Sequence, residues 1–154
     1  MPRQFERHHY EGYGERGLTD IRYIVVHHSG VAIESSVQAI RNWHQSNNGW
    51  PDIGYQFVIM WSGQVVQTMP ITRVSFHVAG RNRESIGICI PGDWTRELPP
   101  QPALDSLVGL VDLLRSNLGR PVPVVGHGEH ALPSNPSACP GRALATWVRE
   151  TFQE

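Results

Sequence analysis

Two histidines and one cysteine stand near the ends of short apolar runs in this sequence of 154 residues. His27 lies in the run IRYIVVHH, His127 follows VPVVG, and Cys139 comes after it in a proline-rich loop. Imidazole nitrogens and a thiolate are ligands that zinc prefers, and a site with three protein ligands leaves the fourth position of a tetrahedral ion open for catalysis. The long separation of His27 from His127 is unlike the short spacings of zinc fingers. The pattern therefore favours catalytic zinc over a structural finger.

The residues alone leave two questions open. A histidine at a strand end is by default a surface residue with ordinary hydrogen bonds, and this is the alternative to a shared metal site. Neighbouring residues in a strand point to opposite faces of the sheet, so only one of His27 and His28 can face such a site. The pattern does not choose between them.

Composition and charge exclude several classes of function. The 13 basic and 14 acidic side chains give a formal net charge of −1, so the chain lacks the positive field with which nucleic-acid-binding proteins gather phosphates. Every basic residue is arginine, which excludes mechanisms that need a lysine amine. No stretch approaches the ~18 apolar residues of a membrane span, and the N-terminus lacks the apolar core of a signal peptide. We expect a monomer that is made in the cytoplasm and has no membrane or nucleic-acid partner.

Hydrophobic periodicity predicts one α/β domain over residues 21–154, preceded by an irregular lead-in of residues 1–20. Apolar and alternating runs predict strands over residues 21–28, 55–61, 64–68, 85–90 and 122–126, the second and third forming a hairpin. Helices are predicted from a Ser35 cap to residue 47, over 102–118, and around 144–152. The interleaved order predicts a central mixed sheet flanked by helices, with strand 21–28 at its centre.

Five motifs resemble those of the type 2 N-acetylmuramoyl-L-alanine amidases, a family that includes amidase-type phage lysozymes and peptidoglycan recognition proteins. In chain order they are VVHHS, GWPDIGYQFVI, FHVAGRNRESIGICIPG, VVGHGEH and SACPG. The resemblance covers about residues 20–150 and implies a zinc ion at the base of a surface groove. By the same resemblance the first histidine of VVHHS is a ligand, so the implied zinc ligands are His27, His127 and Cys139.

The resemblance implies roles for four further residues. Tyr55 matches the catalytic tyrosine of the family, although an aromatic residue in the core is the alternative. Ser137 stands where phage members often carry Lys and many recognition proteins carry Thr, so it is expected to stabilise the transition state more weakly, unless it is an ordinary loop serine. His77 and Asn82 are expected to contact substrate, with a solvent-facing loop histidine and a turn residue as the alternatives. Independently of the resemblance, Trp50 lies in a predicted loop and is a substrate-binding candidate because its ring could stack on a sugar face, although it could instead cover the edge of the core.

The function implied is zinc-dependent hydrolysis of bacterial peptidoglycan at the amide between N-acetylmuramic acid and L-alanine. The leading interpretation is a phage endolysin that reaches the cell wall after its release from the cytoplasm. One alternative is a cytoplasmic amidase that recycles muropeptides. Another is a non-catalytic peptidoglycan-binding module, which arises in this family when the cysteine ligand is lost; Cys139 is present and favours the enzyme.

Overall fold

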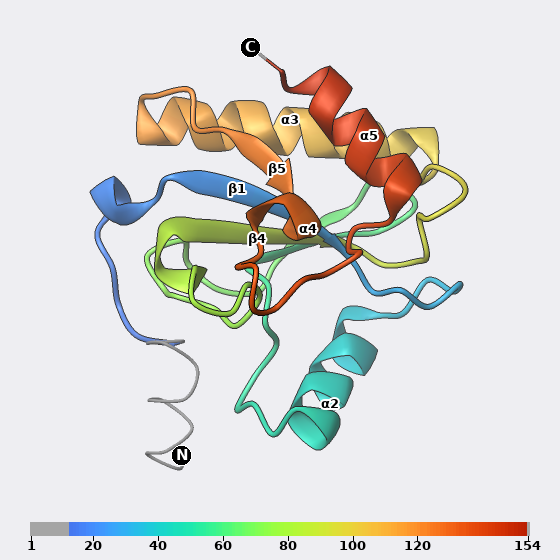
Figure 1. Cartoon of the computed structure of the whole chain (residues 1–154), viewed down its shortest axis with the longest axis horizontal. Helices are drawn as coiled ribbons and strands as arrows, with labels where there is room; N and C mark the ends of the chain where they lie inside the picture. Colours follow the sequence, from blue (N-terminus) through green and yellow to red (C-terminus); the bar gives the residue numbers. More distant parts are fainter. Residues whose placement is uncertain (1–12, 154) are drawn as a thin grey trace.

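A five-stranded mixed sheet forms the centre of the computed structural model, which describes residues 13–153 (Figure 1). Its strands are β1 (Tyr23–His28), β2 (Phe57–Ile59), β3 (Val65–Gln67), β4 (Ser85–Ile90) and β5 (Val124–Gly126), in the spatial order β3-β2-β4-β1-β5. The β2–β3 hairpin is antiparallel and the other pairs are parallel. The predicted mixed sheet is confirmed, but its middle strand is β4 rather than β1, because the hairpin adds two strands on the β4 side.

Helices cover both faces of this sheet. The elements are η1 (Leu18–Asp20), α2 (Val37–Asn47), η2 (Asn82–Glu84), α3 (Gln101–Leu118), α4 (His127–His130) and α5 (Arg142–Thr151). Figure 1 shows α3 and α5 on one side of the sheet and α2 on the other. The N-cap of α2 is Ser36 rather than the predicted Ser35, since the Ser36 hydroxyl accepts a hydrogen bond of 3.0 Å from the Ala39 amide.

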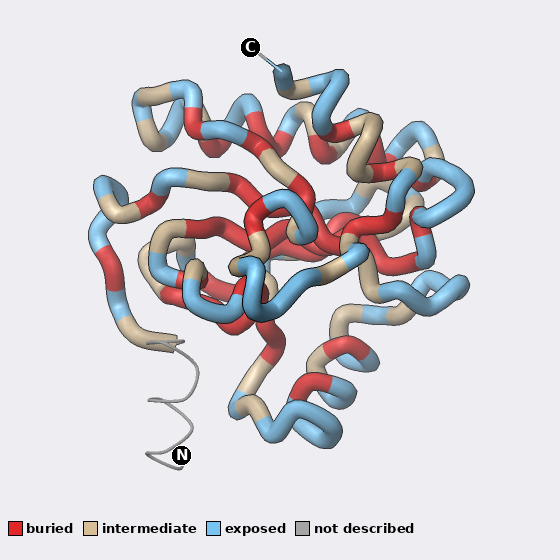
Figure 2. Tube along the Cα trace, in the orientation of Figure 1, coloured by how far each residue is buried: buried red, intermediate tan, exposed pale blue. Residues whose placement is uncertain are grey.

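Alternation along the strands assigns different residues to the two faces. On β4, Ile86, Ile88 and Ile90 belong to the large apolar cluster that also contains the inner faces of α3 and α5. The intervening Ser85, Gly87 and Cys89 therefore point to the face on which α2 lies. Figure 2 shows burial concentrated in the middle of the sheet, where β4 is buried along its whole length, whereas the edge strand β3 is largely exposed.

Part of the predicted lead-in belongs to the folded domain. The Arg16 side chain is 5% exposed, and its Nη1 donates hydrogen bonds of 3.1, 2.9 and 2.7 Å to the carbonyls of Asn82, Arg83 and Ser85. Residues 13–20 thus pack against the start of β4, whereas residues 1–12 of the lead-in lie outside the described residues. Between residues 13 and 153, no helix combines the length and apolarity needed to cross a bilayer.

Candidate metal centre and active site

The two histidines and the cysteine singled out in the sequence meet at one end of the sheet. His27 lies near the end of β1, His127 begins α4 directly after β5, and Cys139 lies in the loop before α5. The parallel pairing of β1 with β5 places the ends of these strands side by side. One ligand atom from each residue lies within 4.8 Å of the other two, and Cys139 Sγ is 3.6 Å from His27 Nδ1.

Only one member of the histidine pair contributes to this cluster. His27 is 1% exposed and directs Nδ1 toward Cys139. The ring of His28 turns the other way, where its Nδ1 accepts a hydrogen bond of 3.2 Å from the Trp94 amide. The alternation of side chains along β1 therefore separates the two neighbours.

The donor set fits a divalent metal ion. Zinc bond lengths of about 2.0–2.1 Å to nitrogen and 2.3 Å to sulfur in a tetrahedron put N and S about 3.5 Å apart, close to the observed separation. Burial lowers the pKa of His27 well below its ordinary value and that of His127 to about 4, so both rings are neutral near pH 7 and offer lone pairs. Burial also raises the pKa of the Cys139 thiol to about 12, and a bound cation would favour the thiolate instead.

Tyr55 lies beside these ligands. Its half-buried ring is 5.0 Å from that of His27 and 5.4 Å from that of His44, measured between centroids. Burial raises the pKa of the Tyr55 hydroxyl well above its ordinary value. The hydroxyl therefore keeps its proton at neutral pH and can donate a hydrogen bond next to the metal-ligand cluster.

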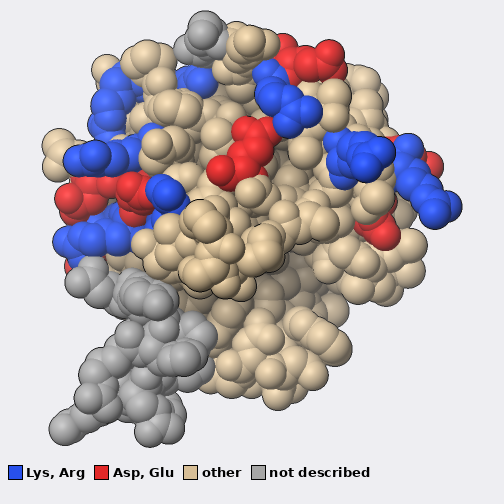
Figure 3. Space-filling view, viewed as in Figure 1, with Lys and Arg blue, Asp and Glu red and all other residues tan. Residues whose placement is uncertain are grey.

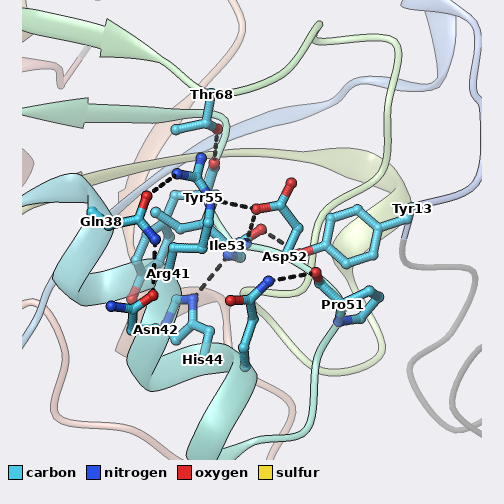
Figure 4. A network of polar contacts seen from close by, with 12 residues as sticks. Tyr13, Gln38, Arg41, Asn42, His44, Pro51, Asp52, Ile53, Tyr55 and Thr68 are labelled. Carbon is cyan, nitrogen blue, oxygen red and sulfur yellow. Dashed lines mark hydrogen bonds and ion pairs between the residues drawn. The ribbon is translucent and has the colours of Figure 1, made fainter. Parts of the chain in front are cut away.

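A polar network ties the segment before Tyr55 to α2 (Figure 4). His44 Nδ1 accepts a hydrogen bond of 2.9 Å from the Gly54 amide, and Arg41 Nε donates at 2.6 Å to Asp52. His44 has no role predicted from the sequence, although its place on the same side of α2 as the buried Ile40 is a signal that it faces inward. The position of Tyr55 thus depends on α2.

A groove of about 490 Å³ opens between α2 and the end of β1. Its lining consists of uncharged residues, namely Ser29, Val31, Ser35, Ala39, Ile40, Trp43, His44, Asn48 and Tyr55. Figure 3 shows a hollow lined by uncharged atoms above α2, with the charged side chains of this face gathered elsewhere. Trp43 is 62% exposed at this groove, and it is not among the residues predicted from the sequence to bind substrate.

Comparison with known proteins identifies the family. The model of the family described as N-acetylmuramoyl-L-alanine amidase (Amidase_2) matches residues 17–142. The chain belongs to this family. The resemblance noted in the sequence is thereby confirmed.

Proteins from phages and animals are similar to this chain in sequence. The endolysin of Klebsiella phage KP32 is 33% identical over 134 residues, which cover 80% of this chain and 83% of the endolysin. Peptidoglycan-recognition protein LB of Drosophila melanogaster is 28% identical over 132 residues, covering 79% of this chain. The match spans only 55% of that relative's length.

A solved structure of an amidase has the same fold. N-acetylmuramoyl-L-alanine amidase LysC from Clostridium intestinale superposes with a TM-score of 0.75 at 23% identity, covering 93% of each chain. The mixed sheet and flanking helices expected for the amidase family are therefore present here.

Two other residues predicted for the amidase site, Ser137 and Trp50, differ in their distance from the ligand cluster. Ser137 Oγ accepts a hydrogen bond of 3.1 Å from the Cys139 amide and lies 3.5 Å from His127 Nδ1. Trp50 is half-buried, with its ring centroid 4.8 Å from that of His44 and 5.3 Å from that of Phe76. Ser137 thus adjoins the ligand cluster, whereas Trp50 packs beneath the segment that carries Tyr55.

His77 and Asn82 are buried behind the ligand cluster. His77 is 8% exposed, and its Nδ1 lies 2.8 Å from His27 Nε2. Asn82 is 3% exposed, and its Oδ1 accepts hydrogen bonds from the amides of His77 at 2.8 Å and Val78 at 2.7 Å. The turn alternative for Asn82 agrees with these bonds. A contact of either residue with substrate remains a prediction.

Proposed function

We propose that this protein is a zinc-dependent N-acetylmuramoyl-L-alanine amidase that cleaves the amide between the lactyl group of N-acetylmuramic acid and L-alanine of peptidoglycan. The observation that carries the proposal is the complete trio of ligand atoms within 4.8 Å of one another. The trio adjoins Tyr55, which itself lines an open groove. Family membership and the similarity to phage endolysins support the same activity.

In this proposal His27, His127 and Cys139 hold the zinc ion. When bound, zinc supplies Lewis acidity, which makes water nucleophilic near neutral pH and polarises a carbonyl oxygen. Tyr55 donates its hydroxyl proton in a hydrogen bond to the attacking water or to the developing oxyanion. Ser137 assists Tyr55, and it adds less because its hydroxyl carries no positive charge. Substrate contact by Asn82 and Trp50, neither of which lines the groove, remains part of the proposal.

As the biological role we propose lysis of bacterial cell walls by a phage endolysin. The protein would be made in the cytoplasm, act as a monomer, and reach peptidoglycan after release. A second endolysin, from Enterobacteria phage K11, supports this role, being 31% identical over 76% of this chain and 77% of its own length.

Non-catalytic recognition is the second candidate function. The similarity to a mutant of Drosophila PGRP-LB that was solved in complex with tracheal cytotoxin, at a TM-score of 0.75 and 25% identity, supports ligand binding, which both candidate functions require. The complete ligand trio, Cys139 included, favours the enzyme.

Purified sacculi offer a direct test of the activity. We expect the protein to release new L-alanine amino termini without new reducing ends, to stop when a chelator removes the metal, and to recover when zinc is returned. Binding to sacculi without new termini would instead indicate a recognition module. A strong preference for soluble anhydro-muropeptides over sacculi would indicate recycling rather than lysis.

A further inference from the structure

The histidine at position 77 contacts a metal ligand rather than the groove. Its Nδ1 lies 2.8 Å from Nε2 of His27, and the two rings meet edge to face at a centroid distance of 4.9 Å. The other ring nitrogen of His27, Nδ1, is the one that faces Cys139. From this geometry we infer that His77 is a positioning residue, which fixes the tautomer and the ring orientation of His27 for metal binding. The inference rests on the proposed metal site.

The hydrogen-bond chemistry fixes the direction of the His27–His77 contact. A neutral imidazole that gives the lone pair of Nδ1 to a metal carries its proton on Nε2. That proton then points at His77 Nδ1, which accepts it. Metal-bound histidines usually donate this second N–H to a carboxylate, a backbone carbonyl or water, and such partners raise metal affinity. In this chain a second histidine provides the acceptor.

Two features of the fold hold the His77 side chain in place. Behind the ring, a Cβ added at Gly87 of β4 would come within 2.9 Å of the ring atoms Cγ and Nδ1, so the absence of a side chain at Gly87 makes the close approach possible. Asn82 Oδ1 accepts hydrogen bonds from the amides of His77 and Val78, which fix the backbone that carries the ring. Arg16 in turn binds the carbonyl of Asn82. The ring is therefore set by the packing of β4 and by a fixed turn.

Burial separates this role from substrate contact. His77 is 8% exposed, and among the described residues that line the groove beside Tyr55 it does not occur. A substrate in that groove therefore reaches Tyr55 without touching His77. The two interpretations predict different kinetic consequences, because a substrate contact changes KM and a positioning residue changes metal affinity.

Two substitutions at one position provide the test. His77→Leu removes the acceptor at similar volume, whereas His77→Asn places an amide oxygen near the position of Nδ1. We expect the dissociation constant for zinc, measured by competition with a chromogenic chelator, to rise about 10- to 100-fold in His77→Leu. His77→Asn should stay within a few-fold of the parent protein, and KM for peptidoglycan at saturating zinc should stay unchanged in both variants.

The possible contrary results are distinct. Zinc affinity within twofold of the parent in His77→Leu would overturn the inference, and a raised KM in that variant would assign His77 to substrate. Equal losses of zinc affinity in His77→Leu and His77→Asn would show that His77 acts through packing alone and not as a hydrogen-bond acceptor. Since zinc binding is measured without peptidoglycan, a parent protein that binds zinc but hydrolyses nothing would refute the proposed function and leave this test intact.

A change at Gly87 tests the packing without altering a ligand or an acceptor. Gly87→Ala should push the His77 ring away from β4 and weaken zinc binding several-fold. Gly109→Ala in α3, where an added Cβ meets nothing within 4 Å, is the matched control and should bind zinc like the parent. Unchanged zinc affinity in Gly87→Ala would contradict the proposed dependence on this close approach.

Discussion

The two faces of the sheet differ in what they bury. The face beneath α3 and α5 buries a continuous apolar cluster that runs from Ile21 to Val148. On the face toward α2 the apolar cluster is small, consisting of Ile40, Ile53, Val58 and Met69. Buried polar side chains, among them His27, His77 and Gln56, occupy much of the remaining space on that side. One face of the sheet thus carries the main apolar core, and the other carries the candidate metal site.

Hydrogen bonds make the polar face possible. A buried polar group costs free energy unless it has a partner. The fully buried side chain of Gln56 has a partner for each of its polar atoms. Its Oε1 accepts hydrogen bonds from the Gly87 amide at 2.7 Å and from the Ser75 hydroxyl at 3.0 Å. Its Nε2 donates a hydrogen bond of 2.9 Å to the Arg73 carbonyl. Apolar contacts therefore fix the first face, and specific partners fix the second. We expect substitutions on the two faces to separate stability from activity.

The largest effect on stability is expected on the apolar face. Leu107 of α3 is fully buried in the large cluster, so Leu107→Ala should lower the free energy of unfolding by about 2–5 kcal/mol. Denaturant unfolding measures this change. The folded fraction should keep its zinc content and its turnover number, and a loss of either would show that the two faces are not independent.

On the polar face, Tyr55→Phe should have the opposite effect and change activity rather than stability. Loss of the hydroxyl should slow turnover on sacculi by about 10²-fold while zinc content and unfolding free energy stay near those of the parent. Tyr23→Phe is the matched control, because Tyr23 lies at the other end of β1, with its ring 4.3 Å from His130. An unchanged turnover rate in Tyr55→Phe would show that the Tyr55 hydroxyl has no part in catalysis and that the ring only packs in the core.

A smaller effect is expected at Ser137. Ser137→Ala should reduce turnover by less than about tenfold, because the hydroxyl lacks the charge that would make it a strong oxyanion donor. Steady-state kinetics with the exposed Ser116→Ala as control measures this difference. A loss as large as that of Tyr55→Phe would give Ser137 an equal share in catalysis.

The smallest effect, and the only gain, is expected on α3. Gly109→Ala adds a methyl group at an exposed helix position with nothing within 4 Å, so it should raise the unfolding free energy by up to about 1 kcal/mol. Thermal unfolding measures the shift, with hydrolysis unchanged. A decrease in stability would mean that α3 packs more tightly there than its surroundings indicate.

The sequence predicts regular elements well where alternation is strong. The bounds of β4 are those expected, because Ile86, Ile88 and Ile90 alternate with small residues. The helix α4 was not predicted, because its four residues carry no hydrophobic period and include Gly128. Capping at Ser36 instead of Ser35 is a choice between adjacent hydroxyls that spacing alone does not make.

The arrangement of the candidate metal site is harder to predict from the sequence than the helices and strands are. The pattern identifies His27, His127 and Cys139 as possible ligands, but only the family resemblance selects His27 over His28. The contact of His77 with His27 joins residues 50 positions apart. It depends on the space left by Gly87 on a third segment, and no periodicity encodes such a three-way arrangement.

The most direct test of the proposed metal-dependent amidase activity is the zinc content of the parent protein and of Cys139→Ser, measured together with hydrolysis of sacculi. We expect about one zinc per chain in the parent. Cys139→Ser should lose both the metal and the hydrolysis while it stays folded. Full hydrolysis by metal-free protein, or by Cys139→Ser without zinc, would contradict the proposed mechanism.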